Sequence, residues 1–496
     1  MAKPIMIQGT ASNVGKSIIA TGLCRIFSQD GFLVAPFKSQ NMALNSFITT
    51  EGLEMGRAQV TQAEAANAVP SVLMNPVLLK PMGDAKSQVI VNGEVWKSLK
   101  AMDYYKEKVS LRPIIQSAFD TLSAKNDIVV IEGAGSPAEI NLKGEDFVNM
   151  GMAKMASSPV LLVGDIDRGG VFASLYGTVI LLDKEEGSRI EGIIINKFRG
   201  DIEILRPGLK QLEDLCGIPV VGVVPWVNLD IDDEDSVSTR LSSHLSGKPI
   251  DIAAVHLPHI SNFTDFTALA NHPVLGVRYV KAAQELEGAD VVILPGTKNT
   301  IEDLLWLRQS GLEAKIKRLA EKGTLIIGIC GGYQMLGERI CDPMRVEVGG
   351  EVCGLGLLPV STSFETQKWR TRVTGTVMEL DGEFSFLSGA SFEGYEIHMG
   401  RSVPSPSANA FSHLITNISD GVVSGNVLGS YVHGLFDSGE IAQRLAAHLL
   451  EKKGLENETE IFDYEAHKQD QFDLLAATMR QSIDIDAIYK MMGVER

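Results

Sequence analysis

Short apolar runs rich in isoleucine and valine recur along the first half of the chain, each bounded by glycine, proline or polar residues. The runs are 4–9, 32–38, 127–135, 159–167, 191–197 and 218–226. Such strands, separated by segments of helical length, predict a parallel sheet that helices cover on both faces. Ligands of such a sheet bind beyond the carboxyl ends of its strands, so polar residues there are the first candidates for a site.

A second series of apolar runs follows a change in composition. Segment 228–249 is acidic and then rich in serine, without a sustained apolar period. After it come the runs 250–258, 289–297, 323–332 and 426–434. The pattern predicts an α/β protein of two domains. We expect a parallel-sheet domain over 1–235, a linker over 236–249, a second α/β domain over 250–445 and a helical tail over 446–496.

The composition narrows the class of protein. Of the 496 residues, 45% are hydrophobic and 22% are charged, which is typical of a globular protein. No apolar run reaches the roughly 18 to 20 residues that span a bilayer, and the N-terminus has no secretory signal pattern. Five scattered cysteines argue against a disulfide framework, and a net charge of −17 disfavours nucleic-acid binding. We therefore expect a cytoplasmic protein without a membrane or nucleic-acid partner.

The segment GTASNVGKS, residues 9–17, follows the first strand and precedes an amphipathic helical pattern. This order is typical of a phosphate-binding loop, although five residues rather than the usual four separate the two glycines. We expect Lys16 to pair with phosphate and Ser17 to bind Mg²⁺. The loop residues expected to bind the nucleotide are Gly9, Thr10, Asn13, Val14, Gly15, Lys16 and Ser17. The alternative is an ordinary turn of small residues.

Three further strand ends carry polar residues at the same edge of the predicted sheet. Glu132 could approach the same metal ion, Lys38 could neutralise a phosphoryl group, and Asn196 could contact a base edge. Each also has a plainer interpretation as a solvated acid, a surface lysine or a strand-end asparagine.

The segment LIIGICGGYQMLG, residues 325–337, predicts a nucleophile. A buried strand runs into Cys330, two glycines follow, and a helix begins near Tyr333. A cysteine at such a junction faces a helix N-terminus, which favours a thiolate, and the N–H of Gly331 can point at an oxyanion. The alternative is a buried core cysteine; the other four cysteines lack this context.

A thiolate nucleophile needs a base, and the sequence contains nine histidines. His433 stands at the end of an apolar strand, directly before a glycine, and is the first candidate. His256, His259 and His398 are the alternatives. Gly296, at another strand end, could supply a second oxyanion donor.

The two constellations together fit one reaction. Phosphorylation by ATP converts an unreactive carboxylate into an acyl phosphate, which ammonia can displace. A cysteine that attacks the side-chain amide of glutamine releases that ammonia through a thioester. The combination predicts an amide synthase that depends on ATP and glutamine.

Several long motifs of the chain resemble those of known protein families. GTASNVGKS resembles the lengthened phosphate loop of the dethiobiotin synthetase superfamily, and GICGGYQMLG with YVHG resembles class I glutamine amidotransferases. Their order, together with KSQNMALNS (38–46), EGAGSPAEINL (132–142), GDIDRGGVFAS (164–174) and GYEIHMGR (394–401), resembles the cobyric acid synthase family of cobalamin biosynthesis. The likeness extends over essentially the whole chain.

The resemblance implies a substrate and a set of roles. The substrate would be (adenosyl)cobyrinic acid a,c-diamide, amidated at its b, d, e and g carboxylates, with ATP, Mg²⁺ and glutamine. Cys330 would be the glutaminase nucleophile and His433 its base. Gln40, Asn41 and Asn45 would lie near phosphoryl transfer, and Asp146 would face the corrinoid. Glu64 would be a further metal ligand, or else a solvated helix acid.

One position departs from the family pattern. Most class I amidotransferases place Glu two residues after the histidine, and Leu435 stands there in this chain. We therefore expect a Cys–His dyad, with reduced or conditional glutaminase activity.

Three rival functions stay open in the sequence. One is a cobyrinic acid a,c-diamide synthase, which has the same domain logic and a different pair of carboxylates. Another is a partitioning-type ATPase switch, which would not need Cys330 and His433. The third is a regulatory glutamine-binding module with an inactive site.

Overall fold

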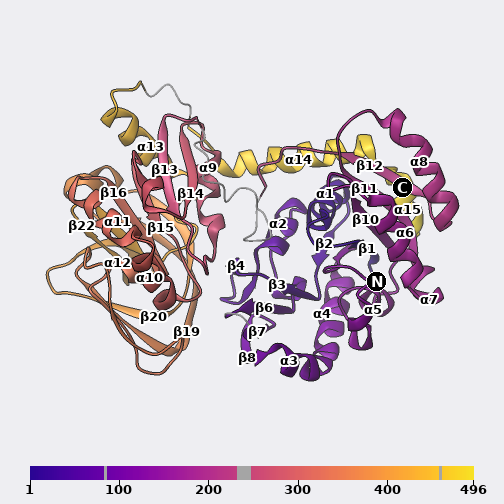
Figure 1. Cartoon of the computed structure of the whole chain (residues 1–496), viewed down its shortest axis with the longest axis horizontal. Helices are drawn as coiled ribbons and strands as arrows, with labels where there is room; N and C mark the ends of the chain where they lie inside the picture. The colour runs from indigo at the N-terminus through magenta and orange to yellow at the C-terminus, as the bar shows by residue number, and fades with distance from the viewer. Residues whose placement is uncertain (83–85, 232–246, 457–460, 496) are drawn as a thin grey trace. The chain divides into compact units, whose positions relative to one another are not determined.

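The computed structural model describes residues 1–82, 86–231, 247–456 and 461–495 (Figure 1), and the chain divides into two compact units. Unit 1 comprises 1–43, 54–231 and 468–496, and unit 2 comprises 44–53 and 232–467. Most of the predicted linker, 236–249, lies outside the described residues.

Unit 1 is built on a six-stranded sheet in which every neighbouring pair is parallel. Its order is β12 (Val220–Pro225), β11 (Ile190–Phe198), β10 (Val160–Asp165), β1 (Lys3–Gly9), β9 (Ile128–Glu132) and β2 (Val34–Phe37). These strands confirm the six apolar runs predicted from the sequence. The three central strands β10, β1 and β9 are almost entirely buried, as expected for a sheet covered on both faces.

The helices of unit 1 connect these strands, as a parallel sheet requires. They include α1 (Lys16–Gln29), α2 (Arg57–Ala65), α4 (Arg112–Lys125), α5 (Met150–Met155), α6 (Val171–Leu181) and α8 (Ile202–Cys216). A second sheet has the order β3 (Gln40–Met42), β6 (Val77–Pro81), β7 (Lys86–Val91) and β8 (Glu94–Lys100). Short elements are β5 (Glu54–Gly56), α3 (Ala101–Glu107) and α7 (Lys184–Gly187).

The end of the chain completes the core of unit 1. It forms α14 (Tyr464–Ser482), of which unit 1 includes the part from Lys468, and α15 (Ile485–Met492). Phe472, Met479 and Ile488 are buried in the same apolar cluster as α1 and the sheet. The N–H of Asp484 donates to the carbonyl of Val221 in β12. The tail is therefore part of the first hydrophobic core rather than an appendage.

Unit 2 contains a mixed sheet with a parallel half. The parallel strands are β14 (Leu275–Val280), β13 (Ile250–Val255), β15 (Val291–Leu294), β16 (Leu325–Ile329) and β23 (Val427–Ser430). Four of them confirm predicted runs, and β14 was not predicted. The sheet continues through β22 (Ser419–Ser424), β21 (Asn409–Leu414), β19 (Val360–Val377), β17 (Arg339–Asp342) and β18 (Gly350–Cys353), with β20 (Ser391–Pro404) beside β19.

The helices of unit 2 bury one extended apolar cluster against this sheet. They are α9 (Thr267–Asn271), α10 (Thr300–Gln309), α11 (Leu312–Glu321), α12 (Gly331–Leu336) and α13 (Glu440–Lys452). The inserted segment 44–53 contributes the short strand β4 (Ser46–Ile48). Ile48 of this strand is buried with Tyr395 and Ile397 of β20.

The predicted fold class is confirmed: the protein is α/β, with a parallel-sheet unit and a second α/β unit. The predicted domain limits differ from the two units in segment 44–53 and in the tail from Lys468. The cause is tertiary packing, because apolar side chains of these segments are buried away from their sequence neighbours. In the described part of the chain, no helix is long and apolar enough to cross a membrane.

Candidate functional site

The phosphate-binding loop runs between β1 and α1, as the sequence predicts. Within this loop Asn13 has a φ of 60°, a left-handed conformation that asparagine tolerates better than most residues. Gly15 starts the helix with a φ of 99°. The Nζ of Lys16 reaches back to the carbonyl of Ala11 at 2.9 Å and to that of Gly135 at 3.1 Å. The lysine thus lies over the loop, where a phosphate would be held.

Asn196 supports this loop from the neighbouring strand β11. Its Nδ2 donates to the carbonyl of Val14 at 2.9 Å. A Cβ on Gly15 would lie 2.0 Å from that same nitrogen, so only glycine fits at this position. Asn196 thus holds the loop backbone through its amide donor, and its contact with a base edge stays a prediction.

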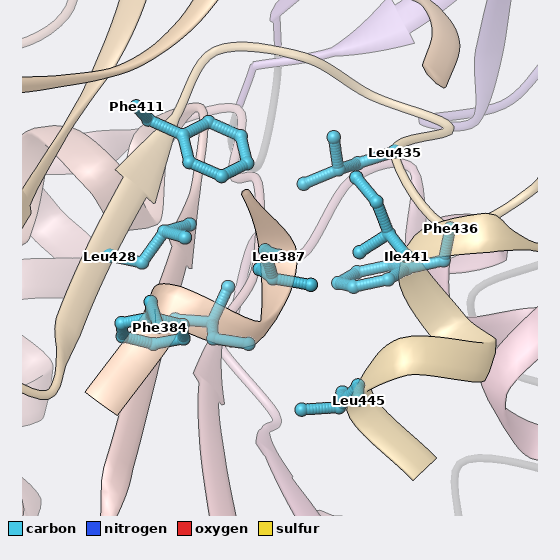
Figure 2. A pocket seen from close by; sticks show the side chains of 9 residues that line it. Phe384, Leu387, Phe411, Leu428, Leu435, Phe436, Ile441 and Leu445 are labelled. Carbon is cyan, nitrogen blue, oxygen red and sulfur yellow. The ribbon is translucent and has the colours of Figure 1, made fainter. Parts of the chain in front are cut away.

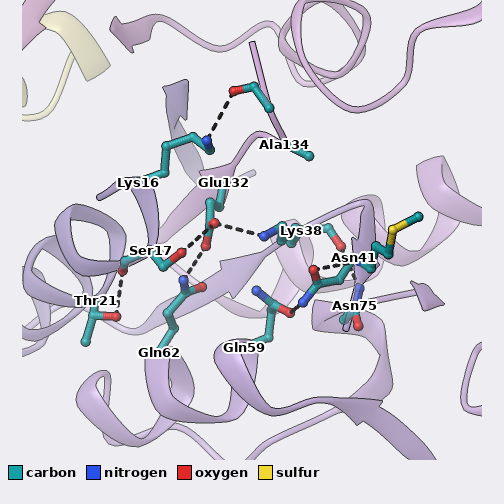
Figure 3. A network of polar contacts seen from close by, with 12 residues as sticks. Lys16, Ser17, Thr21, Lys38, Asn41, Gln59, Gln62, Asn75, Glu132 and Ala134 are labelled. Carbon is teal, nitrogen blue, oxygen red and sulfur yellow. Dashed lines mark hydrogen bonds and ion pairs between the residues drawn. The ribbon is translucent and has the colours of Figure 1, made fainter. Parts of the chain in front are cut away.

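Glu132, at the end of β9, is the centre of a buried polar network (Figure 3). Its Oε1 accepts hydrogen bonds from the Oγ of Ser17 and the Nζ of Lys38, each at 2.9 Å. Its Oε2 accepts from the Nε2 of Gln62 at 2.5 Å. The structure therefore brings Ser17, Lys38 and Glu132 together, as predicted, although they are far apart in sequence.

The helix α2 contributes a residue that the sequence analysis missed. Gln62 holds Glu132, whereas Glu64, the predicted metal ligand, pairs with Lys468 at 3.2 Å. Residues two apart on a helix point to different sides, so Gln62 and Glu64 do not share one face. The structure thus places Gln62, and not Glu64, on Glu132, and a metal-binding role of Glu64 stays a prediction. The only signal for Gln62 in the sequence was that the segment TQAEA, which contains it, follows the candidate acceptor motif.

The residues expected near phosphoryl transfer are distributed between the units. Asn41 donates through Nδ2 to the Oε1 of Gln59 at 3.0 Å, next to the Glu132 network (Figure 3). Gln40 accepts a 2.5 Å hydrogen bond from the hydroxyl of Tyr104. Asn45 belongs to the segment that clusters with unit 2 and is not grouped with Lys38.

Asp146 has a different environment from the one expected. Its carboxylate accepts the backbone N–H groups of Val148, Asn149 and Gly151 at 2.7 to 3.0 Å. These bonds fold the turn that leads into α5. The observed role of Asp146 is thus to organise a loop.

In unit 2, Cys330 occupies the junction between β16 and α12, as predicted. Its backbone has φ 51° and ψ −106°, an unusual conformation for a residue with a side chain, and strain of this kind is concentrated at functional sites. The backbone N–H of Cys330 donates to the carbonyl of Ser430 at 2.8 Å, and its Sγ lies 3.7 Å from the carbonyl oxygen of Ile397. The thiol is buried.

His433 is the histidine that reaches this thiol. Its side chain is hydrogen-bonded to Cys330, and its Nδ1 lies 2.6 Å from the Oδ2 of Asp265. Burial opposes the charged ring, but the interactions with the Asp265 carboxylate and with Cys330 outweigh it and raise the pKa of His433 to about 10. The arrangement is a Cys–His–Asp triad, and the predicted dyad is wrong.

Asp265 is held firmly in this role. It is 3% exposed, and its Oδ1 accepts the N–H of Gly434 at 3.1 Å. It lies in a 3₁₀ turn, Phe263–Phe266, beyond the carboxyl end of β13. The sequence offers one signal for Asp265, which is an acid in an apolar stretch just after a parallel strand. No motif fixes its spacing from His433.

Leu435 explains why the usual acid position is unused. Its side chain points into a small apolar cavity together with Leu387, Phe411 and Phe436 (Figure 2). Leu435 is 2% exposed. A carboxylate at this position would be buried among hydrocarbon side chains, which is costly without a partner.

The other candidate histidines have other partners. His259 pairs with Asp303 at 2.7 Å, and His398 bonds the carbonyl of Gly400, with burial lowering its pKa to about 4. His256 is half-buried beside Tyr279.

Both glycines expected near the oxyanion line the triad. A Cβ on Gly296 would lie 2.9 Å from the Cε1 of His433, so this glycine abuts the base. Gly331 follows Cys330 directly at the start of α12.

Comparison with known proteins agrees with this division of the chain. Residues 5–236 match the family model of the CobQ/CobB/MinD/ParA nucleotide binding domain. Residues 251–441 match the model of the CobB/CobQ-like glutamine amidotransferase domain. The fold and the two sites thus define a class: a nucleotide-binding unit joined to a glutamine amidotransferase.

Full-length relatives identify the family within this class. The chain is 56% identical to the cobyric acid synthase of Ruminiclostridium cellulolyticum, over 100% of this chain and 98% of that protein. It is 55% identical to the one from Lachnoclostridium phytofermentans, over 99% of both chains, and 51% identical to the one from Photorhabdus laumondii, over 100% and 99%. The chain belongs to the cobyric acid synthase family, enzymes of cobalamin biosynthesis.

Proposed function

We propose that the enzyme amidates the b, d, e and g side-chain carboxylates of (adenosyl)cobyrinic acid a,c-diamide to give (adenosyl)cobyric acid. ATP activates each carboxylate as an acyl phosphate, and glutamine supplies the ammonia. The observation that carries the proposal is the presence in one chain of the Lys16–Ser17–Glu132 constellation and the Cys330–His433–Asp265 triad.

Unit 1 performs the activation in this proposal. The backbone of the loop from Gly9 to Ser17 binds the phosphates, and Lys16 adds a positive charge. Lys38 is already buried beside Glu132, so it can follow the charge that develops on the phosphoryl group as it moves to the acceptor carboxylate.

The residues around Glu132 fit a magnesium ion. The Oγ of Ser17 and the carboxylate of Glu132 are adjacent oxygen donors, which Mg²⁺ prefers. The Oε1 of Gln62 is a buried oxygen without a hydrogen-bond partner in the described part of the chain. When bound, Mg²⁺ would neutralise phosphate charge, while Gln62 and Lys38 keep the carboxylate in place.

Unit 2 releases ammonia in this proposal. His433 holds the proton that Cys330 has given up, and the thiolate attacks the side-chain amide carbon of glutamine. The N–H groups of Gly296 and Gly331 stabilise the oxyanion, and protonated His433 gives its proton to the departing ammonia. Water then hydrolyses the thioester. Asp265 stabilises the charged ring throughout.

Gln40 and Asn41 follow Lys38 on β3 and are our candidates for holding the acceptor carboxylate, with Asn45 next along the chain. Asp146 supports the same region indirectly, since it orders the loop before α5.

The direct test is to incubate the protein with ATP, Mg²⁺, glutamine and the a,c-diamide, and to weigh the corrinoid by mass spectrometry. We expect successive replacement of hydroxyl by amino groups at the b, d, e and g positions. An unchanged mass with folded protein, for both the adenosylated and the unadenosylated substrate, would refute the proposal. Amidation of cobyrinic acid at a and c instead would favour the diamide synthase.

A variant separates the two half-reactions. Lys16→Ala removes the phosphate-binding cation, and we expect amidation to fall on the order of 10³-fold with either glutamine or ammonia. Retention of ammonia-dependent synthesis in this variant would show that Lys16 does not act in carboxylate activation.

A further inference from the structure

One segment of the chain touches the surroundings of all three triad residues. It is the inserted segment 44–53, which leaves unit 1 after β3 and returns to it at β5. Its strand β4 lies against β20 of unit 2, and Ser46 and Ile48 are fully buried there. The chemistry of the triad does not by itself require this segment.

The first contact is with the loop that carries Asp265. The backbone N–H of Ser46 donates to the Oδ1 of Asn262 at 2.9 Å. Asn262 is 2% exposed and has a φ of 52°, and its carbonyl accepts the N–H of Asp265. The peptide of Ser46 therefore fixes the start of the turn that presents the triad acid.

The second contact is with the residue that lies on His433. The hydroxyl of Tyr395 donates to the carbonyl of Ser46 at 2.9 Å. The ring of Tyr395 stacks on His433 with centroids 5.3 Å apart and planes inclined by 20°. The backbones of Tyr395 and His433 also exchange two hydrogen bonds. Tyr395 therefore ties the base to the inserted segment.

The third contact reaches the nucleophile. Ile48 is buried with Ile397. The carbonyl of Ile397 is the group that lies 3.7 Å from the Sγ of Cys330.

Both ends of the segment continue into the network around Glu132. On one side, β3 carries Asn41, which bonds Gln59 of α2. On the other side, β5 runs directly into α2, whose Gln62 bonds Glu132. The chain thus links the carboxylate of the nucleotide site to the surroundings of the triad by a short covalent path.

We propose that segment 44–53 positions the glutaminase triad, through Ser46, Asn262 and Tyr395, and makes glutamine hydrolysis respond to nucleotide and acceptor bound in unit 1. This inference rests on the proposed function for the identity of those ligands. Asn262 and Tyr395 are positioning residues, because neither is required to contact glutamine. A rearrangement of α2 around Glu132 is transmitted to them through the backbone of the segment.

The test compares glutamine hydrolysis with and without ATP, Mg²⁺ and the corrinoid acceptor. In the unsubstituted enzyme we expect these ligands to stimulate hydrolysis. Tyr395→Phe keeps the stacked ring and removes the bond to Ser46, and we expect the stimulation to fall roughly three- to tenfold, the effect of one hydrogen bond. Tyr489→Phe is the matched control, because Tyr489 is also buried and its hydroxyl donates to Asp30 in unit 1, outside the elements that carry the triad.

A second pair of variants tests the other contact. Asn262→Gly keeps the left-handed backbone and removes the acceptor for Ser46, so we expect the same loss of stimulation. Asn262→Asp keeps an acceptor oxygen and should restore it. Thermal unfolding of each variant, and the alkaline limb of its pH profile, separate lost positioning from a general loss of stability.

The outcomes are distinct from those of the proposed function. Amidation with ammonia in place of glutamine should be unchanged in the Tyr395 and Asn262 variants. Stimulation that persists in both Tyr395→Phe and Asn262→Gly would overturn the inference, as would equal hydrolysis with and without ligands in the unsubstituted enzyme. Absence of ammonia-dependent amidation would instead refute the proposed function.

Discussion

The two units each place a buried carboxylate at the centre of their site, and the two carboxylates differ in their partners. Glu132 in unit 1 is surrounded by one cation and two neutral donors, from Lys38, Ser17 and Gln62. Asp265 in unit 2 is matched to the imidazole of His433 and one backbone N–H. The partners of Glu132 come from separate segments of unit 1, whereas Asp265 and the imidazole of His433 form a single pair.

The difference extends to unsatisfied polar atoms. In the described part of the chain, buried atoms without a hydrogen-bond partner include Gln62 Oε1, Gln59 Nε2 and Ser39 Oγ, next to the Glu132 network. Among the described residues, no buried side-chain nitrogen or oxygen of His433 or Asp265 lacks a hydrogen-bond partner. Buried polar atoms are normally paired, so the nucleotide site has contacts left for a ligand while the triad is assembled in advance.

The strongest way to separate the units is to remove the nucleophile. Cys330→Ala leaves no sulfur to attack glutamine, so glutamine-dependent amidation should fall more than about 10⁴-fold. Ammonia-dependent amidation should persist, because unit 1 is untouched. Corrinoid mass spectrometry with each nitrogen source checks this. Cys353→Ser, at an exposed cysteine, is the control and should behave like the unsubstituted enzyme. Loss of both activities in Cys330→Ala would contradict the division of labour.

The second prediction concerns the acid of the triad. Asp265→Asn removes the charge that raises the pKa of His433, and glutamine-dependent kcat/KM should fall about 10²- to 10³-fold. Because the pKa of His433 falls, the alkaline limb of the pH profile should move to lower pH. In the unsubstituted enzyme the ring should stay charged until the pH approaches about 10, whereas the stability that the charged ring contributes is complete below the ordinary histidine pKa of 6.5 and is lost progressively as the pH rises from there to about 10.

A matched pair of residues controls for this substitution. Asp303 holds His259 at 2.7 Å in the same unit, so Asp303→Asn also removes a carboxylate from a histidine. We expect its alkaline limb to stay in place. An unshifted limb in Asp265→Asn would mean that Asp265 does not set the charge of His433.

The third prediction tests the apolar cavity beside the triad. Leu435→Glu introduces the acid usual in related amidotransferases, but the side chain would point among Leu387, Phe411 and Phe436. We expect a loss of about 3 kcal/mol in the free energy of unfolding, measured by urea titration, and no gain in glutaminase rate. Leu435→Met should cost less than about 1.5 kcal/mol. A stable, faster Leu435→Glu enzyme would show that the cavity does not exclude a carboxylate.

The smallest expected effect is in unit 1. Gln62→Ala frees one oxygen of Glu132 from its donor, and we expect the Mg²⁺ concentration for half-maximal activity to rise roughly tenfold. Gln116→Ala is the control, because the half-buried Gln116 also donates to a carboxylate, that of Asp120. Identical magnesium titrations for the two variants would remove Gln62 from the site.

The two sites differ in how many of their residues can be predicted from the sequence. Lys16, Ser17 and Glu132 were predictable because contiguous parallel strands bring their ends to one edge, and Cys330 and His433 follow the same rule. Asp265 was not, because its pairing with a histidine 168 residues away depends on a turn without a motif. The sequence analysis named Glu64 and missed Gln62. The two residues point to different sides of α2, and the sequence does not show which side faces Glu132 without the packing of this helix. The strands β17–β22, whose pairings are mostly antiparallel, alternate polar and apolar positions too irregularly to be predicted.

The position of the last helices has a consequence for the order in which the protein folds during synthesis. Phe472, Met479 and Ile488 belong to the core that also contains α1 and β1, so the first apolar cluster to emerge from the ribosome is completed by the last. Arg25 of α1 forms an ion pair with Asp473 at 2.7 Å, so this pair too cannot form until the end of the chain has been synthesised. Domains generally fold as units during translation, N-terminal first. Here unit 1 must wait with exposed apolar surface while all of unit 2 is made, and a truncated chain that ends before α14 should aggregate although its phosphate loop is intact.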